Sequence, residues 1–386
     1  MFSKSVTLFS MQGIDIKIDP SWLLIAALIT WSLSQQYFPI SLPDQSPAAY
    51  FLMALVAMLC FFASLLLHEL AHSAVAIRYG VPINGITLFL FGGMAELEKE
   101  PPTAFVEFVI ALAGPLMSFA LAFAFWVVAE ASVVAGSAAS ATAVLSYLAM
   151  INFVLAVFNL VPAFPLDGGR ILRAALWYRS GDSLKATETA AGAGKIFAYV
   201  LIGLGVLALF QGAFVVGLWQ ILIGTFLYGA AQTSYQSELM RTAFKEKTVG
   251  ALMKRDPQTA TVDMTISDFV NQIMLAKRVT FAPVVAENVL LGHIDQAVLA
   301  DIDRENWNNT RVEDVYAALT PDATVPQDMP IADLLTHIAK TGRRKFLVLE
   351  GGDLAGVITL ADISSYLQVV EPLLRGGLAA KLIHAR

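Results

Sequence analysis

Two histidines and a glutamate stand together in an apolar stretch of the sequence, in the run His68-Glu69-Leu70-Ala71-His72. Residues four positions apart lie on the same face of a helix, so both imidazoles can bind one divalent ion. This spacing is typical of zinc enzymes in which the intervening glutamate activates a water beside the metal. The alternative is a chance spacing of polar residues near a helix end. We favour the zinc site, because burying three such side chains in a lipid-exposed helix is costly without a function.

A catalytic zinc ion has three protein ligands and one open position, so two histidines do not complete the site. The apolar part of the chain holds no third histidine, and the best remaining candidate is Asp167. Its neighbours include two prolines, which break helices, and two glycines, which allow unusual backbone angles. Irregular backbone at membrane depth is tolerated only inside protein or beside a water-filled cavity. The alternative is an ordinary turn residue at the membrane boundary.

These residue types together can hydrolyse a peptide bond. Glu69 would take a proton from the attacking water and pass it to the leaving amine, while zinc stabilises the oxyanion. Asn159 lies in the same broken segment as Asp167 and offers an amide that can hold the substrate backbone or the oxyanion. Packing between helices is an equally open interpretation of Asn159.

The elements that must position these residues are membrane spans, each of which needs about 20 mostly apolar residues. The sequence predicts about six of them. They cover residues 22–38, 50–75, 105–129, 143–162, 196–210 and 215–230, and the last two are also compatible with one kinked hairpin.

Basic residues in the loops predict the orientation of the spans. Lys and Arg occur before the first span and after the second, fourth and sixth, whereas residues 39–49 and 130–142 contain none. Because cytoplasmic loops are enriched in Lys and Arg, we expect both termini in the cytoplasm. His68 then comes about 18 residues, or roughly 27 Å, into an inward-running helix. That depth is close to the cytoplasmic side, which is also where Asp167 lies.

The stretch from Ile83 to Leu97 is too short to span as a helix and has strand character followed by two glycines. An extended edge beside the zinc could hold an unwound substrate as an added strand. A hairpin with only a packing role remains the alternative.

The composition supports a membrane part and a soluble part. The chain has 386 residues, of which 57% are hydrophobic and 15% charged, and the apolar surplus lies before about residue 240. The net charge of −6 gives no support to a nucleic-acid partner. The single cysteine, Cys60, allows no disulfide within one chain. We read no cleavable signal peptide in the first twenty residues.

The paired motifs resemble the site-2 protease family of intramembrane zinc metalloproteases. The resemblance rests on the histidine run and the segment from Asn159 to Gly169, with support from Gly92-Gly93 and Ala113-Gly114-Pro115, and it covers about residues 15–235. It implies His68, His72 and Asp167 as zinc ligands, Glu69 as catalytic base and Asn159 as a substrate-binding residue. It also implies cleavage of single-pass membrane proteins in regulated intramembrane proteolysis.

Two similar units of about 60 residues, at about 249–304 and 312–370, fill the soluble tail. Each has a short helix, a Thr-containing strand entry, an amphipathic helix, two strands and a closing helix, which resembles a tandem pair of CBS domains. In that family a strand-ending Thr approaches phosphate and an Asp three residues later holds a ribose. Thr359 and Asp362 match this pattern, whereas Asp295 and Val298 do not. Helix capping is the equally open interpretation of Thr359 and Asp362.

We therefore expect a polytopic α-helical membrane protein with a short membrane-associated β segment in residues 1–240, and a soluble α/β tandem CBS module in residues 241–386. The expected function is intramembrane zinc endopeptidase in the cell (inner) membrane, with single-pass membrane proteins as substrates. Adenine nucleotide at the CBS module and a homodimer through that module are further expected partners. The alternatives are a CBS-gated transporter or channel and a catalytically dead scaffold.

Overall fold

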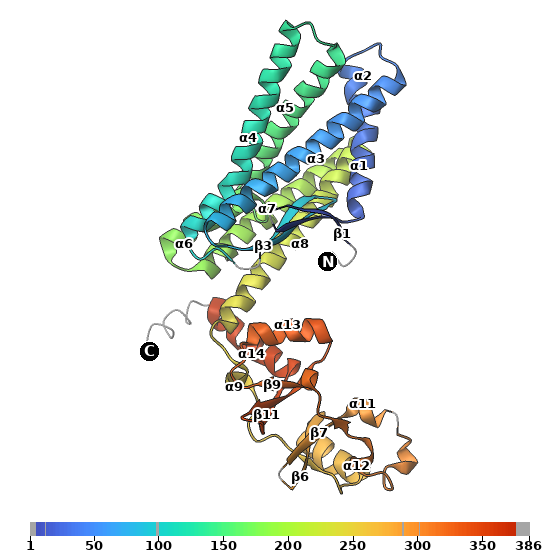
Figure 1. The fold of residues 1–386 in the computed structure, drawn as a ribbon, viewed down its shortest axis with the longest axis vertical. Coiled ribbons are helices and arrows are strands. Elements are labelled where there is room, and N and C mark those ends of the chain that lie inside the picture. The colour runs from blue at the N-terminus through green and yellow to red at the C-terminus, as the bar shows by residue number, and fades with distance from the viewer. Residues whose placement is uncertain (1–4, 12, 98–99, 288, 301, 376–386) are drawn as a thin grey trace. The chain divides into compact units, whose positions relative to one another are not determined.

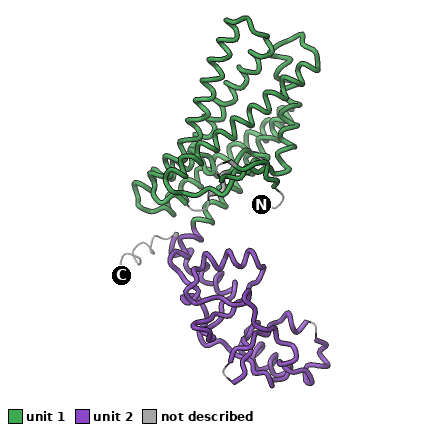
Figure 2. The backbone as a smooth tube through the Cα atoms, viewed as in Figure 1, with its two compact units in different colours: residues 1–238 green, residues 239–386 purple. Residues whose placement is uncertain are grey.

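The computed structural model describes residues 5–11, 13–97, 100–287, 289–300 and 302–375. The chain divides into two compact units, residues 1–238 (unit 1) and residues 239–386 (unit 2), as Figure 2 shows. Long helices and a small sheet make up unit 1, and two α/β repeats make up unit 2.

Among the described residues of the chain, six helices are long and apolar enough to cross a membrane, which confirms the expected count. The predicted boundaries shift by a few residues, and the last two spans are separate full-length helices joined by residues 211–213. The spans are Ser21–Ser41 (α1 Ser21–Ser32, the π-helical Leu33–Tyr37 and α2 Phe38–Ser41), α3 Pro47–Arg78, α4 Ala104–Val134, α5 Ala139–Asn159, α7 Ser183–Phe210 and α8 Phe214–Phe244 (Figure 1).

Side-chain caps fix where three of these helices begin. Ser46 accepts a hydrogen bond from the Ala49 amide at the start of α3, and Pro47 occupies the first turn, where its missing N–H costs nothing. Thr103 caps α4 in the same way, and Asp182 caps α7. These local signals determine where the helices begin, whereas packing against the other helices determines which side chains face the interior.

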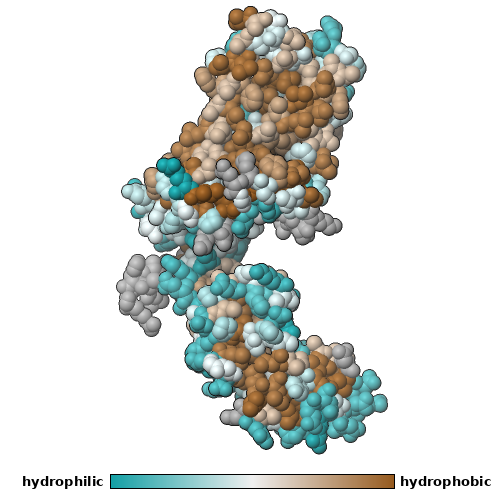
Figure 3. All heavy atoms as spheres, in the orientation of Figure 1, coloured by the Kyte–Doolittle hydropathy of each residue, from teal (hydrophilic) through white to brown (hydrophobic). Residues whose placement is uncertain are grey.

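Large apolar side chains cover the outside of the helices. Leu23 and Phe123 are 64% exposed and Val215 is 73% exposed. Figure 3 shows the same property as a predominantly apolar surface over the long helices of unit 1. A soluble protein rarely exposes so large a contiguous apolar surface, whereas in lipid it carries no penalty.

A four-stranded sheet of order β1-β2-β3-β4 packs against the helices. β3 (Ile83–Phe89) and β4 (Gly92–Leu97) form the extended segment expected from the sequence, and β4 lies at the edge of the sheet. A second hairpin, which was not predicted from the sequence, consists of β1 (Val6–Met11) and β2 (Ile14–Ile18), and β2 pairs in parallel with β3. The sequence signal that could have predicted this hairpin is the alternation of apolar residues on both sides of Gly13.

The sheet is placed beside α3 by a shared apolar cluster. Ile16 of β2 and Ile86 of β3 are buried against Ala76 of α3 and against Val106 and Ile110 of α4. This packing holds β3 and β4 next to the half of α3 that carries the two histidines.

The two repeats of unit 2 follow the predicted order of elements. The first has β6 (Phe281–Ala286) and β7 (Val289–Asp295), and the second has α13 (Ile331–Thr341), β10 (Lys345–Glu350) and β11 (Asp353–Thr359). The amphipathic helix expected in the first repeat begins as α10 (Ile266–Asp268) and continues as a π-helix over Phe269–Leu275. The last helix of the unit is α14 (Leu360–Arg375). The shorter elements are α9 Val249–Leu252, β5 Ala260–Thr261, α11 Gln296–Leu299, the 3-10 helix Arg304–Asn306, α12 Val312–Val315, β8 Ala317–Ala318, the 3-10 helix Pro321–Ala323 and β9 Thr324–Pro326.

Each repeat has a core of its own. Phe269 and Ile294 are fully buried in the first, and Leu334 and Phe346 in the second. A smaller cluster of Phe281, Leu347 and Val357 joins the sheets of the two repeats into one module.

Candidate metal centre

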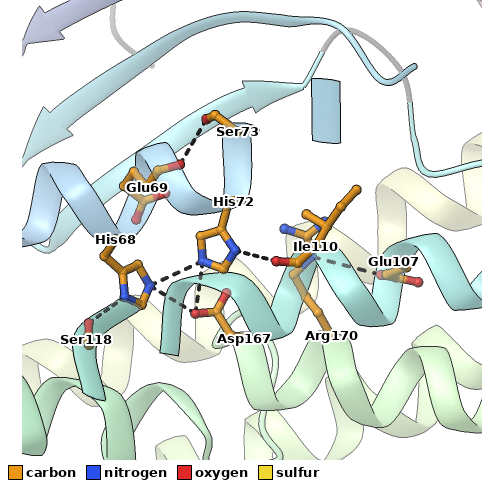
Figure 4. A network of polar contacts seen from close by, with 9 residues as sticks. All are labelled: His68, Glu69, His72, Ser73, Glu107, Ile110, Ser118, Asp167 and Arg170. Carbon is orange, nitrogen blue, oxygen red and sulfur yellow. Dashed lines mark hydrogen bonds and ion pairs between the residues drawn. The ribbon is translucent and has the colours of Figure 1, made fainter. Parts of the chain in front are cut away.

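The α3 helix carries both histidines on its buried face. His68 is 2% exposed and His72 is 6% exposed, and Figure 4 shows the two imidazoles projecting from neighbouring turns of the helix toward Asp167. Their separation of four residues produces this arrangement, as the sequence predicts. Burial removes water from both rings, so each polar ring nitrogen requires a partner inside the protein.

Three ligand atoms from these side chains converge on one point. The Nε2 atoms of the histidines lie 3.2 Å apart, and Oδ2 of Asp167 lies 3.1 Å from Nε2 of His68 and 3.2 Å from Nε2 of His72. Zinc bonds of about 2.0–2.2 Å place neighbouring tetrahedral ligands about 3.3–3.5 Å apart, so the triangle fits one face of a zinc tetrahedron with little adjustment. These three residues form a group that can hold a metal ion.

The other ring nitrogens are held by α4. Nδ1 of His72 donates to the carbonyl oxygen of Ile110 at 2.7 Å, and Nδ1 of His68 lies 2.8 Å from the hydroxyl of Ser118. A carbonyl only accepts, so a neutral His72 presents a lone pair at Nε2, and a hydrogen bond donated to Ser118 gives His68 the same tautomer. Two lone pairs and a carboxylate oxygen then face one another, an arrangement that a bound cation would stabilise.

A glycine on α4 makes room for this cation. A Cβ atom at Gly114 would lie 2.2 Å from Nε2 of His72 and 2.5 Å from Nε2 of His68. Any larger residue would therefore occupy the position of the ligand atoms themselves. Gly114 lies between Ile110 and Ser118 on one face of α4, so a single helix face supplies the space and both histidine partners.

Asp167 is the first residue of α6 (Asp167–Ser180) and follows the non-helical segment after α5. The expected unusual backbone angles at Gly168 and Gly169 are absent, because both glycines are helical with negative φ. Their role is close approach instead. A Cβ at Gly168 would lie 2.2 Å from the carbonyl oxygen of Leu160, and one at Gly169 would lie 2.3 Å from the Phe164 amide nitrogen. The segment thus folds tightly over the start of α6 and presents Asp167 to the histidines.

Glu69 lies on α3 beside the histidine pair and faces the sheet (Figure 4). A Cβ at Gly93 of β4 would lie 2.7 Å from Cγ and 3.2 Å from Oε1 of Glu69, so this edge strand passes directly against the carboxyl group. The catalytic candidate and the edge strand are therefore neighbours.

Asn159 is the last residue of α5 and is half-buried. The structure assigns its side chain no hydrogen bond among the described residues, in contrast to the histidines and Asp167. Another asparagine on α5, Asn152, is fully buried and donates to Ser64 of α3 at 3.3 Å. No spacing rule links residues on different helices, so the sequence did not predict the roles of Asn152, Ser64, Ser118 and the Ile110 carbonyl.

The side-chain contacts at the end of β11, in the second repeat, differ from those at the end of β7, in the first repeat. Thr359 donates to Oδ2 of Asp362 through both its amide and its hydroxyl, which is a helix-capping arrangement, and Lys254 lies 3.2 Å from Oδ1 of Asp362. At the equivalent end of the first repeat, Lys345 donates to Asp295 at 3.0 Å. Burial raises the pKa of Asp295, but the ammonium group of Lys345 outweighs it and holds that pKa below its usual range.

The models of two known families match different parts of the chain. The model of Peptidase family M50 matches residues 56–135 and 131–204, which include both histidines and Asp167. The model of the CBS domain matches residues 249–299 and 312–369.

Several curated proteins resemble the chain over nearly its whole length. The putative zinc metalloprotease Rip3 of Mycobacterium tuberculosis is 34% identical over 367 residues, covering 95% of this chain and 93% of its own. Zinc metalloprotease MJ0392 of Methanocaldococcus jannaschii is 31% identical, covering 95% of this chain and 97% of its own. The solved site-2 protease of Methanocaldococcus jannaschii is 32% identical, covers 60% of this chain and 95% of its own, and superposes with a TM-score of 0.43. The chain therefore belongs to peptidase family M50, the site-2 proteases, as a membrane-embedded zinc metalloprotease with a tandem pair of CBS domains.

Proposed function

We propose that this protease cleaves single-pass membrane proteins within the bilayer, as a step of regulated intramembrane proteolysis. The observation that carries the proposal is the convergence of two histidines and an aspartate, with Glu69 beside them, in a unit whose helices are apolar outside. A transporter or channel, the other candidate, is not supported, because the relatives that match the full chain are zinc metalloproteases.

In this proposal His68, His72 and Asp167 hold the zinc. When bound, zinc supplies the Lewis acidity that favours ionisation of water and stabilises negative charge on a carbonyl oxygen. Ser118 and the Ile110 carbonyl keep both rings in the orientation that directs Nε2 toward the metal. Glu69 accepts the proton of the attacking water on its carboxylate and delivers it to the leaving amine nitrogen.

The substrate must be unwound before its peptide bond can be attacked, because a helix shields its own backbone. The edge strand β4 supports this step, since one side of it pairs with β3 and Gly93 passes against Glu69. An extended substrate that adds to this edge comes to lie beside the catalytic carboxyl group. Asn159, whose amide group has no hydrogen bond among the described residues, is proposed to bind the substrate backbone.

A cleavage assay tests the proposal. The full chain is co-expressed with a panel of single-pass membrane proteins and compared with Glu69→Gln and with Glu130→Gln, an exposed glutamate on α4. We expect Glu69→Gln to retain zinc and to lower cleavage by at least about 100-fold, and the control to cleave normally. Normal cleavage by Glu69→Gln would reject Glu69 as the base. Undiminished cleavage by a variant lacking zinc would reject the metal centre.

The proposed orientation places both termini and the CBS module in the cytoplasm, from the distribution of basic residues in the loops. A labelling experiment tests it. In a Cys60→Ser background, Ser137→Cys in the loop between α4 and α5 should react with an impermeant maleimide on intact cells. Ser180→Cys, at the end of α6, should react only after lysis. The reverse pattern contradicts the orientation.

We further propose that adenine nucleotide modulates the protease through Thr359 and Asp362. Lys254, beside Asp362, adds a positive charge that favours phosphate. Titration of the full chain with ATP and AMP should raise its unfolding temperature, and Asp362→Ala should weaken that effect. The matched substitution Asp295→Ala at the other end of the module should not. An unfolding temperature that neither nucleotide changes contradicts this proposal.

Pairing of two chains through the CBS modules is also proposed. Leu275 and Val289 of the first repeat are 67% and 59% exposed, and dimerisation would bury such side chains. Light scattering of the full chain in detergent should give a dimer. A monomer at every protein concentration contradicts the pairing.

A further inference from the structure

A buried ion pair joins α4 to α6 close to the metal centre. Glu107, in the first turn of α4, is 1% exposed, and Arg173 of α6 is 6% exposed. Nε of Arg173 lies 3.3 Å from Oε2 of Glu107, close enough for charge pairing but without the alignment of a hydrogen bond. Arg170, one turn earlier on α6, lies 4.0 Å from Oε1 of the same carboxylate. Arg173 also donates to Glu100 at 2.9 Å.

The buried carboxylate belongs to the helix face that already serves the histidines. Glu107, Ile110, Gly114 and Ser118 follow one another at intervals of three and four residues along α4, so they share one face. The last three contact the imidazoles or leave room for the ligand atoms. Glu107, on the same face, forms ion pairs with two arginines of α6.

The same ion pair fixes the helix that begins with Asp167. Arg170 and Arg173 follow Asp167 by three and six residues, so the guanidinium groups and the carboxylate lie within the first two turns of α6. A rotation or slide of α6 along α4 would carry Oδ2 of Asp167 away from both Nε2 atoms. Displacements of about 1 Å at such a site are enough to cost activity about 100-fold.

Buried ion pairs contribute little net stability, because desolvation offsets most of their attraction. Their best-attested role is to specify one arrangement of the elements that carry them. Charge pairing adds to the other contacts between α4 and α6 a preference for the register that brings Glu107 and Arg173 together.

We propose that Glu107 and Arg173 are positioning residues, whose ion pair sets the register of α6 on α4 and so places Asp167 against His68 and His72. This inference rests on the proposed role of Asp167 as a metal ligand. It assigns no contact with substrate or metal to the pair.

Cobalt spectroscopy of the full chain tests the proposal, because the visible d–d absorption of Co²⁺ reports the geometry of its ligands. The variants are Glu107→Asp, which keeps the charges but shortens the side chain, and the double variant Glu107→Leu/Arg173→Met, which replaces the pair by apolar groups. The matched controls on the same two helices are Glu130→Gln and Arg179→Met, both at exposed positions.

We expect both test variants to fold, to change the Co²⁺ spectrum and to bind zinc about 10- to 100-fold more weakly, with kcat lowered more than KM. The controls should match the wild type. A test variant that is folded, with wild-type unfolding temperature, Co²⁺ spectrum and zinc affinity, overturns the proposal. If the double variant does not fold, Glu107→Asp decides.

The variant Asp167→Asn separates this inference from the proposed function. A Co²⁺ spectrum unchanged by Asp167→Asn would mean that Asp167 is not a ligand, and the proposed metal centre would fail. A spectrum changed by Asp167→Asn but not by the Glu107 and Arg173 variants would refute only the positioning role.

Discussion

The Nε2 atoms of His68 and His72 lie 3.2 Å apart, and when each ring carries its proton on Nδ1 neither Nε2 can donate to the other. The hydrogen-bond partners of both Nδ1 atoms come from α4. The metal affinity of the centre therefore depends on a helix that contributes no ligand.

Replacing Ser118 by Ala removes the partner of His68 Nδ1 and leaves this buried ring nitrogen without its hydrogen bond. We expect zinc to bind about 10- to 100-fold more weakly, as is usual when a histidine ligand loses its hydrogen-bond partner. Competition with a chelating dye measures the affinity. The matched control is Ser132→Ala on the same helix, whose hydroxyl bonds Ala129 and Thr142 away from the centre. Equal affinities in the two variants would show that Ser118 does not support His68.

Replacing Gly114 by Ala places a methyl group where the ligand nitrogens lie, at 2.2 Å from Nε2 of His72. We expect this variant to lose bound zinc and cleavage together, although alanine raises helix propensity by about 1 kcal/mol. Zinc content and cleavage are measured on the same preparation. Gly203→Ala in α7, where a Cβ meets nothing within 4 Å, should retain both. A Gly114→Ala protein with full zinc content would contradict the close approach of α4 to the centre.

Replacing Gly93 by Ala brings a Cβ to 2.7 Å from Cγ of Glu69 and forces either the strand or the carboxyl group to move. The three atoms nearest to this Cβ all belong to Glu69, so we expect zinc affinity to be retained and kcat to fall by about 10- to 100-fold. The neighbouring change Met94→Leu, at an exposed position, serves as the control. Unchanged kcat in Gly93→Ala would place the productive position of Glu69 away from β4.

His293 in unit 2 gives a pH dependence whose sign follows from its surroundings. It is 8% exposed, and burial lowers its pKa, with Asp295 opposing the shift and Arg343 and Lys345 adding to it. The unfolded chain then binds a proton more readily than the folded one. The stability contributed by neutral His293 is present above about pH 6.5 and is lost as pH falls toward the lower folded pKa.

Hydrogen exchange of residues 281–295 in the full chain measures this effect. Between about pH 7.5 and about pH 5.5 the wild type should lose more local protection than His293→Gln, after correction for the intrinsic exchange rate. Equal losses in the two proteins would show that another group titrates.

Local patterns in the sequence predict much of this structure, because they depend on residues that are near neighbours in the chain. The histidines four residues apart, the apolar stretches of span length and the repeated order of elements in unit 2 are all patterns of this kind. They predict the metal-binding residue types, the six spans and the tandem CBS fold. The N-terminal hairpin had such a signal in its alternating residues, and the sequence analysis missed it.

Only the tertiary structure shows which side chains on different helices contact one another. Ser118 beside His68, the Ile110 carbonyl beside His72 and Glu107 beside Arg173 join residues 38 to 66 positions apart in the chain. The sequence alone determined which side chains can bind zinc, because ligand chemistry belongs to residue type and local spacing. Helix packing determined how those side chains are oriented, since the relative rotation of two helices depends on every contact along their interface and leaves no periodic signal in either one.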